Sequence, residues 1–167
     1  MKHKVINKQE NSKTCLVCGL KNDLGLKAQF YELENKELAA VFEPLEEHQS
    51  YPGRLHGGIA SAILDETIGR AILIKDKSVW GVTVEINVRY KKSIPLGEEL
   101  KVVGRITKDT SRLFEGSGEI ILPNGDVAVT ATGKYLKMPL EKIADFDFEA
   151  EEWRVTSLEN DPKEIDY

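Results

Sequence analysis

The chain has 167 residues, 41% hydrophobic and 31% charged, which is ordinary for one soluble globular domain with a sizeable core. Its net charge of -5, from 23 basic and 28 acidic residues, argues against a general nucleic-acid-binding protein. No apolar run approaches the length of a membrane span, and the polar stretch 1–13 lacks the hydrophobic region of a signal peptide. We therefore expect a cytoplasmic protein with neither a membrane nor a nucleic acid as its partner.

The first residues, 1–14, are predicted to form a loose, solvated start, and a CxxC pair, Cys15 and Cys18, follows them. Such a pair can supply half of a zinc site or form a redox couple. There is no second cysteine pair to complete a zinc site, although two chains could share a four-cysteine site. Turn-forming residues 21–25 stand where a thioredoxin-like motif needs a helix. The pattern favours a structural knuckle without metal, ahead of shared zinc and then redox chemistry.

A strand hairpin and a helix are predicted next. Residues 26–33 alternate between apolar and polar side chains, which predicts a half-buried strand, and residues 37–42 form its hairpin partner. The helix that the rest is organised around follows in the stretch 51–74. From residue 59 onward it is apolar nearly all the way round, which is typical of a helix buried in the middle of a fold.

Four strands follow the helix in the predicted order. Residues 79–90 alternate cleanly, with an apolar face from Trp80 to Tyr90 and a polar face that includes Thr83. Three more strands, at 100–106, 113–122 and 127–136, form an antiparallel meander separated by turns. One helix too apolar for solvent, together with one antiparallel sheet, predicts an α+β fold in which the sheet wraps the helix.

The acidic residues of the chain gather in its tail. Residues 140–167 hold ten acidic and three basic residues, a net of -7, which leaves the first 139 residues at +2. The slightly basic body is suited to an anionic ligand. The tail also contains aromatic side chains, which pure disorder usually lacks, so we expect it to lie over the body or over a neighbouring subunit.

Two carboxylates lie at the centre of the predicted helix, where an unpaired charge is costly. Glu66 has Arg70 as a partner four residues on, whereas Asp65 has small residues of its own stripe, Ser61 and Gly69, on either side and no cation in the helix. Asp65 could cap a loop or bridge two subunits. Unpartnered carboxylates in buried helices more often have a functional role, so Asp65 is the first candidate for chemistry.

Two glycines, Gly57 and Gly58, follow His56 at the start of this helix. Free N–H groups at a helix start attract negative charge and can stabilise the oxyanion that forms when an acyl carbonyl is attacked, although a plain turn also uses glycines. Gly57 lies about 12 Å along the helix axis from Asp65, so one helix cannot bring both to one carbonyl. If both act, a two-fold dimer must place the helix start of one chain against Asp65 of the other.

Three motifs now carry a family resemblance: Tyr-Pro-Gly-Arg-Leu-His-Gly-Gly at 51–58, Asp-Glu-Thr at 65–67 and Gly-Val-Thr-Val-Glu-Ile-Asn at 81–87. Over about residues 15–138 the chain resembles the hotdog-fold acyl-CoA thioesterases of the phenylacetate-degradation (PaaI) type. The resemblance implies an antiparallel sheet wrapped around one long helix, homodimers that often pair into tetramers, and hydrolysis of a small-molecule acyl-CoA thioester with no metal or organic cofactor.

The resemblance also implies roles for individual residues. Gly57 would donate its N–H to the thioester carbonyl, and His56 would shape this turn. Asp65 of the partner chain would act as general base on water or attack directly to form an anhydride, while Thr83 would orient the water. On its polar face Thr83 could also be plain surface. Further candidates for substrate binding are Gly58, Ser50 (where family members often have Asn or Gly), Glu66, Arg89 and Lys91, with Lys92 and Arg105 as additional candidates for the phosphates of coenzyme A.

The expected organisation is an N-terminal segment with the CxxC knuckle at 1–24, a hotdog thioesterase-like domain at 25–138 and an acidic tail at 139–167. A second hypothesis is a hotdog hydratase or dehydratase in which His56 is the base and a carboxylate is the acid, although the double glycine argues against it. A third is a non-catalytic acyl-ligand binder or a zinc-linked interaction protein, in which Cys15 and Cys18 would be the metal ligands.

Overall fold

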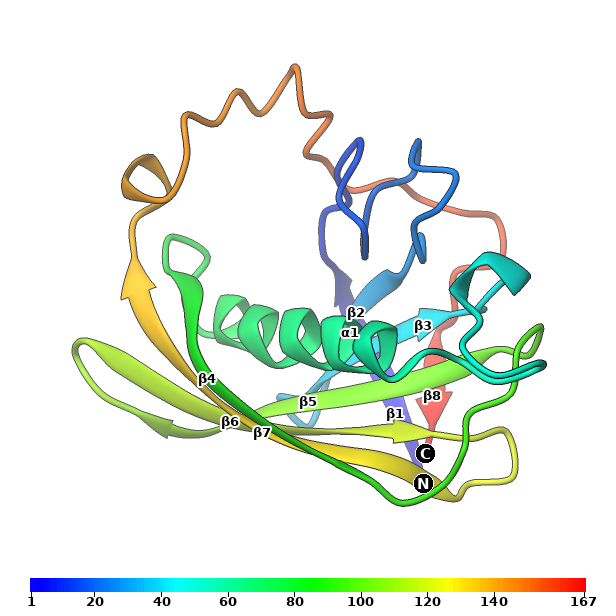
Figure 1. Cartoon of the computed structure of the whole chain (residues 1–167). Coiled ribbons are helices and arrows are strands. Elements are labelled where there is room, and N and C mark those ends of the chain that lie inside the picture. The colour runs from blue at the N-terminus through cyan, green and yellow to red at the C-terminus, as the bar shows by residue number, and fades with distance from the viewer.

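In the computed structural model, which describes residues 1–167, one helix lies across the concave face of an eight-stranded antiparallel sheet (Figure 1). The strands are β1 (Lys2–Lys8), β2 (Gln29–Leu33), β3 (Leu38–Phe42), β4 (Trp80–Tyr90), β5 (Leu100–Asp109), β6 (Leu113–Ile121), β7 (Val127–Met138) and β8 (Glu164–Asp166), in the sheet order β4-β7-β6-β5-β3-β2-β1-β8. The helix α1 (Gly57–Arg70) continues as the 3-10 turn η2 (Ala71–Ile74), and the short 3-10 turns η1 (Glu46–His48) and η3 (Leu140–Lys142) lie outside the sheet. None of these helices combines the length and apolar character needed to cross a membrane.

The predicted apolar stripe of the helix packs on the sheet, which confirms the wrapped arrangement. Ala60, Leu64 and Ile68 of α1 are fully buried. The helix comes so close that a Cβ atom at Gly104 of β5 would lie 2.9 Å from the carbonyl oxygen of Thr67. A glycine at this place in the strand therefore sets how deeply α1 sits in the sheet.

Both ends of the chain add strands to the sheet, so the prediction of a loose start was wrong. β1 pairs with β2 on one side and with β8 on the other. The sequence of β1 is mostly polar and offers no apolar alternation; the strand is held by backbone pairing between segments at opposite ends of the chain. The tail passes over the open side of α1 before it reaches β8, as its aromatic content predicted (Figure 1).

The predicted half-buried strand at 26–33 is also different in the structure. It begins at Gln29, and its residues from Phe30 to Leu33 are buried on both faces. Tyr31 and Leu33 pack against Ile165 of β8 on the face away from the helix. From the alternation, one face of this strand was expected to be exposed to solvent. In the structure the C-terminal tail covers that face.

A β-bulge breaks the alternation predicted for residues 79–90. Thr83 pairs with Tyr135 of β7 and Glu85 pairs with Lys134, so Val84 is an extra residue, and its side chain is 63% exposed. An extra residue shifts every later side chain to the opposite face. Thr83 before the bulge and Ile86 after it therefore both face the helix. The single apolar face from Trp80 to Tyr90 was wrong, and Thr83 is not on a solvent face.

Candidate active site

The carboxylate of Asp65 lies where α1 meets two strands of the sheet. The hydroxyl of Thr83 on β4 donates to Oδ1 at 2.9 Å, and the hydroxyl of Tyr135 on β7 donates to the same oxygen at 3.1 Å. Burial, reinforced by the neighbouring carboxylate, raises the pKa of Tyr135, so this phenol stays protonated and remains a donor. No lysine or arginine forms an ion pair with Asp65. The acid is thus held in a half-buried position by neutral donors, without a cation beside it.

Asp65 and Thr83 line a cavity of about 510 Å³, a size typical of small-molecule sites. The opposite wall comes from the N-terminal knuckle and the tail, through Cys15, Cys18 and Trp153. Trp153 packs against Trp80 of β4, with ring centroids 5.2 Å apart, and lies 4.8 Å from the guanidinium of Arg70. The tail therefore closes this side of the cavity.

The start of α1 forms a separate structure. His56 is the N-cap, and its Nδ1 accepts the Gly58 N–H at 2.9 Å. Tyr90 at the end of β4 donates to the Gly57 carbonyl at 2.7 Å and lies 2.7 Å from the Ser61 hydroxyl. The N–H of Gly57 has no acceptor within the helix because of its position in the first turn.

A second cavity, of about 430 Å³, opens at this helix start. Gly57 and Tyr90 line it, and three cationic residues, Arg54, Lys91 and Lys92, lie around it. Ser50 is on its wall as well. The amide donors of the helix start thus share a pocket with positive charge, which suits an anionic ligand.

The two cavities have no lining residue in common, so the single chain does not bring Gly57 to Asp65. Their separation agrees with the spacing that the sequence predicted for one helix. Any site that uses both residues must combine two copies of the chain.

The remaining predicted binding residues fall into different environments. Arg89 lies with Asn87 on the face of β4 turned away from the helix. Lys92 forms an ion pair with Asp126 at 2.6 Å. Its neighbour Lys91 has no ion-pair partner. Arg105 is remote from both cavities. It binds Glu37 and forms a double hydrogen bond with Glu119.

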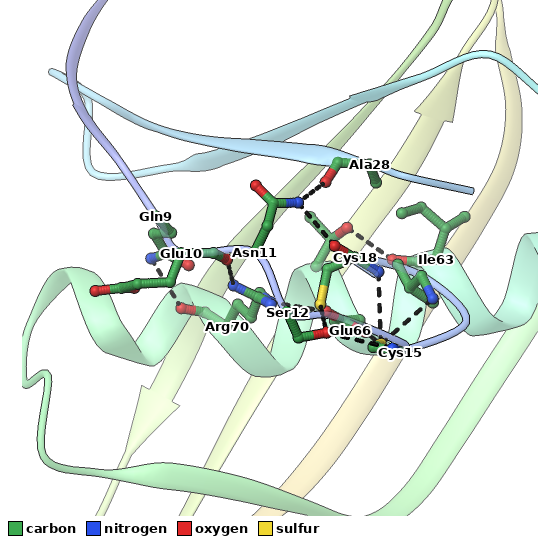
Figure 2. A network of polar contacts seen from close by, with 12 residues as sticks. Gln9, Glu10, Asn11, Ser12, Cys15, Cys18, Ala28, Ile63, Glu66 and Arg70 are labelled. Atoms are coloured by element: carbon green, nitrogen blue, oxygen red, sulfur yellow. Dashed lines mark hydrogen bonds and ion pairs between the residues drawn. The ribbon is translucent and has the colours of Figure 1, made fainter. Parts of the chain in front are cut away.

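Glu66 is engaged on both of its oxygens. Oε1 accepts from Arg70 at 2.9 Å, which confirms the predicted helix pair, and Oε2 lies 3.4 Å from the Cys15 sulfur (Figure 2). Arg70 also donates to the Glu10 carbonyl at 2.9 Å and is 6% exposed. Glu66 and Arg70 therefore tie the N-terminal segment to the middle of α1.

The CxxC pair forms a compact knuckle, and a turn rather than a helix follows it, so it lacks the surroundings of a thioredoxin-like motif. A hydrogen bond with the Cys18 thiol lowers the pKa of Cys15 to about 7. The same bond, together with burial, raises the pKa of Cys18. The Ser12 hydroxyl lies 3.3 Å from the Cys18 sulfur.

Three residues of the two cavities were missed at the level of sequence: Tyr135, Tyr90 and Arg54. Tyr135 had a usable signal, because residues 129, 131, 133 and 135 alternate onto the buried face of β7 and Tyr135 is the only hydroxyl among them. Tyr90 was assigned to the apolar face, and it does face the helix. It does so because of the bulge at Val84, which was not predicted, and not because the strand alternates regularly from Trp80. Arg54 lies at the second cavity because of the way its loop folds, which no local sequence pattern predicts.

Comparison with known proteins agrees with this geometry. Residues 52–129 match the model of the thioesterase superfamily. A crystal structure of a thioesterase superfamily protein superposes with a TM-score of 0.68 at 26% identity, covering 73% of this chain and 59% of that one. The chain therefore has a hotdog fold. This confirms the fold class predicted from the sequence.

One relative and one solved structure illustrate the range of likeness. Acyl-coenzyme A thioesterase 13 of Homo sapiens is 29% identical over 91 residues, which cover 54% of this chain and 60% of the relative. The chain thus spans less than two thirds of that protein's length. A Streptococcus mutans protein bound to acetyl CoA superposes with a TM-score of 0.58 at 20% identity, covering 62% of this chain and 82% of that one, a likeness in fold alone.

Proposed function

We propose that the protein hydrolyses an acyl-CoA thioester to a free acid and coenzyme A, as a hotdog thioesterase of the phenylacetate-degradation type. The observation that carries this proposal is the pair of cavities along one helix: Asp65 is held by neutral donors at one, and Gly57 lies beside cations at the other. The superfamily match and the relative named as an acyl-coenzyme A thioesterase support the substrate class.

Strand β4 offers a way to join the two cavities. It is an edge strand of 11 residues that pairs only with β7, and long exposed edges invite pairing with another chain. Thr83 on β4 contacts Asp65, and Tyr90, seven residues on, contacts Gly57. If two copies of β4 pair antiparallel about Asn87, with Val84 left out of the pairing as it is against β7, the partner's Tyr90 lies opposite Thr83. That register brings the partner's Gly57 toward Asp65 and makes two equal composite sites.

In such a site the two groups divide the chemistry. The N–H of the partner's Gly57 donates to the thioester carbonyl and stabilises the negative charge that develops there. Asp65 takes a proton from a water that attacks the carbonyl carbon, the carbon–sulfur bond breaks, and coenzyme A leaves as its thiolate. In the alternative path the carboxylate itself attacks, and water then hydrolyses the anhydride. In both paths Thr83 and Tyr135 fix the position of the carboxylate.

The two cavities then bind opposite ends of the substrate. Lys91 and Arg54 of one chain lie beside the Gly57 amide, where they would meet the phosphates of coenzyme A. The acyl group would enter the cavity of about 510 Å³ beside Asp65 of the other chain, walled by Trp80 and Trp153. These walls favour an apolar or aromatic acyl group of modest size.

The test is the release of free thiol from a panel of short, long and aryl-substituted acyl-CoAs. We expect turnover far above the spontaneous rate for at least one of them, and a kcat/KM at least about tenfold lower for the matching acyl-pantetheine, which lacks the phosphates that the cations bind. Enoyl-CoA hydration, followed in parallel, should be absent. If no acyl-CoA is cleaved but the acyl-CoAs still bind, the protein is an acyl-ligand binder instead.

Thr83→Val is expected to lower kcat by about tenfold to a hundredfold while KM changes little. The substitution keeps the shape of the side chain and removes the hydroxyl that donates to Asp65, and a hydrogen bond to a charged group contributes about 1.5–3 kcal/mol. Steady-state thiol release measures both constants. Thr83→Ser, which retains the hydroxyl, is the matched control; equal losses in both variants would show that the hydroxyl has no role.

A further inference from the structure

A second chemical cluster lies in the wall of the Asp65 cavity. One ligand atom from each of Cys15, Cys18 and Glu66 lies within 4.8 Å of the other two, and Figure 2 shows the three side chains converging beneath the knuckle. All three residues line the cavity of about 510 Å³. The reaction proposed above uses none of them.

The knuckle is built as thiolate ligands require. The Cys15 sulfur accepts the N–H of Val17 at 3.3 Å and the N–H of Cys18 at 3.5 Å. Two amides aimed at one sulfur hold it in position within the turn. The turn is tight, because a Cβ atom at Gly19 would lie 2.4 Å from the Cys15 carbonyl oxygen. Asn11 fixes the far side by donating to the carbonyls of Cys18 and Ala28, each at 2.9 Å (Figure 2).

Glu66 supplies what the sequence lacked, a third ligand from the same chain. Its Oε1 is bound to Arg70, which leaves Oε2 facing the Cys15 sulfur at 3.4 Å. A tetrahedral zinc ion with zinc–sulfur bonds of about 2.3 Å and zinc–oxygen bonds of about 2.0 Å has sulfur–oxygen edges of about 3.5 Å and sulfur–sulfur edges of about 3.8 Å. The 3.4 Å between Oε2 and the Cys15 sulfur matches such a sulfur–oxygen edge, and all three ligand atoms lie within 4.8 Å of one another.

A divalent cation balances the charges that these ligands carry once both thiols have lost their protons to bind a metal. Two thiolates and the Glu66 carboxylate bring three negative charges, of which the buried Arg70 offsets one. A zinc ion offsets the other two and makes the site neutral, which a buried position requires. The contacts of Arg70 with Glu66 and of Ser12 with Cys18 would then orient the ligands from outside.

We propose that Cys15, Cys18 and Glu66 bind one zinc ion, with its fourth position open to the cavity that Asp65 lines. Three protein ligands and an open position are the arrangement of zinc sites that hold water or a substrate atom, whereas purely structural sites are closed by four ligands. The site does not depend on thioester hydrolysis, and it adds a Lewis acid to the wall of that cavity.

The test is the metal content of the full chain, purified and then dialysed against zinc-free buffer. We expect inductively coupled plasma mass spectrometry to find about one zinc per chain. Replacement by Co²⁺ should give the sulfur-to-cobalt charge-transfer absorption and the intense visible bands of a tetrahedral site. Because both readouts are independent of activity, they separate this proposal from the thioesterase function.

Variants assign the ligands. Glu66→Gln, close to isosteric, should weaken zinc binding by more than about a hundredfold in competition with a chromophoric chelator, and Cys15→Ser should abolish it. Asp65→Asn, a carboxylate of the same cavity next to the proposed ligand, should leave zinc binding unchanged. If Cys15→Ser fails to fold, Glu66→Gln and chelator titration of the wild type decide the question.

Two results would overturn the proposal. One zinc per two chains, with Glu66→Gln retaining it, would assign a four-cysteine site shared between copies. No retained metal, with rapid formation of a Cys15–Cys18 disulfide in air, would identify the knuckle as a redox pair.

Discussion

Asp65→Asn is expected to lower kcat for acyl-CoA hydrolysis by about a hundredfold or more, with little change in KM. The amide keeps the size of the side chain and can still accept from Thr83 and Tyr135, which hold the carboxylate at 2.9 Å and 3.1 Å. It cannot take a proton from water or form an anhydride. The variant should therefore fold and bind substrate while the chemical step fails.

Thiol release under saturating acyl-CoA measures kcat, and calorimetry with the unreactive thioether analogue measures binding. The control is Glu115→Gln on β6, an acid-to-amide change on a residue that faces Lys108 at 3.6 Å, outside both cavities. Turnover equal to that of the wild type would remove Asp65 from the mechanism. A larger loss in Glu66→Gln than in Asp65→Asn would move the base to Glu66.

Local patterns predicted the parts of the fold that depend on local sequence. The buried helix from residue 59 onward, its His-Gly-Gly start and the strands of the meander all follow from periodicity and turn residues, and the structure places them within a few residues of the predicted bounds. The separation of the two candidate groups, Gly57 and Asp65, could also be stated in advance, because helix geometry alone fixes it.

The parts that were missed depend on pairing between distant segments. The bulge at Val84 exists because β4 and β7 come into register on both sides of it, and only then does Thr83 turn toward Asp65. The strands β1 and β8 have no apolar alternation from which they could be predicted. The contact of Glu66 with Cys15 was missed, because no local pattern links two residues 51 positions apart.

Gly57→Pro tests the proposed role of the Gly57 N–H as the donor to the thioester carbonyl. We expect it to lower kcat by about a hundredfold to a thousandfold. Proline removes the N–H that the proposal assigns to the thioester carbonyl. It should leave the helix intact, since position 57 is the first residue of α1, where proline is favoured and no helical hydrogen bond is lost. His56 already has φ -64° and ψ 133°, which suits the residue before a proline.

The matched control is Gly57→Ala, which keeps the N–H. A Cβ atom at this position meets only the Tyr90 ring, at 3.4 Å, an ordinary contact. Gly57→Ala should therefore retain most of the activity. Thermal unfolding should show that neither variant is much less stable than the wild type. Equal activity losses in the two variants would mean that added bulk, rather than the missing donor, is responsible.

Mixing Gly57→Pro with Asp65→Asn then decides whether the site is composite. In a mixed dimer one site carries both substitutions, while the other combines the intact Asp65 of the proline variant with the intact Gly57 of the asparagine variant. Random exchange makes half of the dimers mixed, so activity should recover to about a quarter of the wild-type value from two nearly inactive proteins. The measurement is thiol release after joint refolding of equal amounts. A site contained in one chain would give no recovery at all, because each copy would still lack one of its two groups.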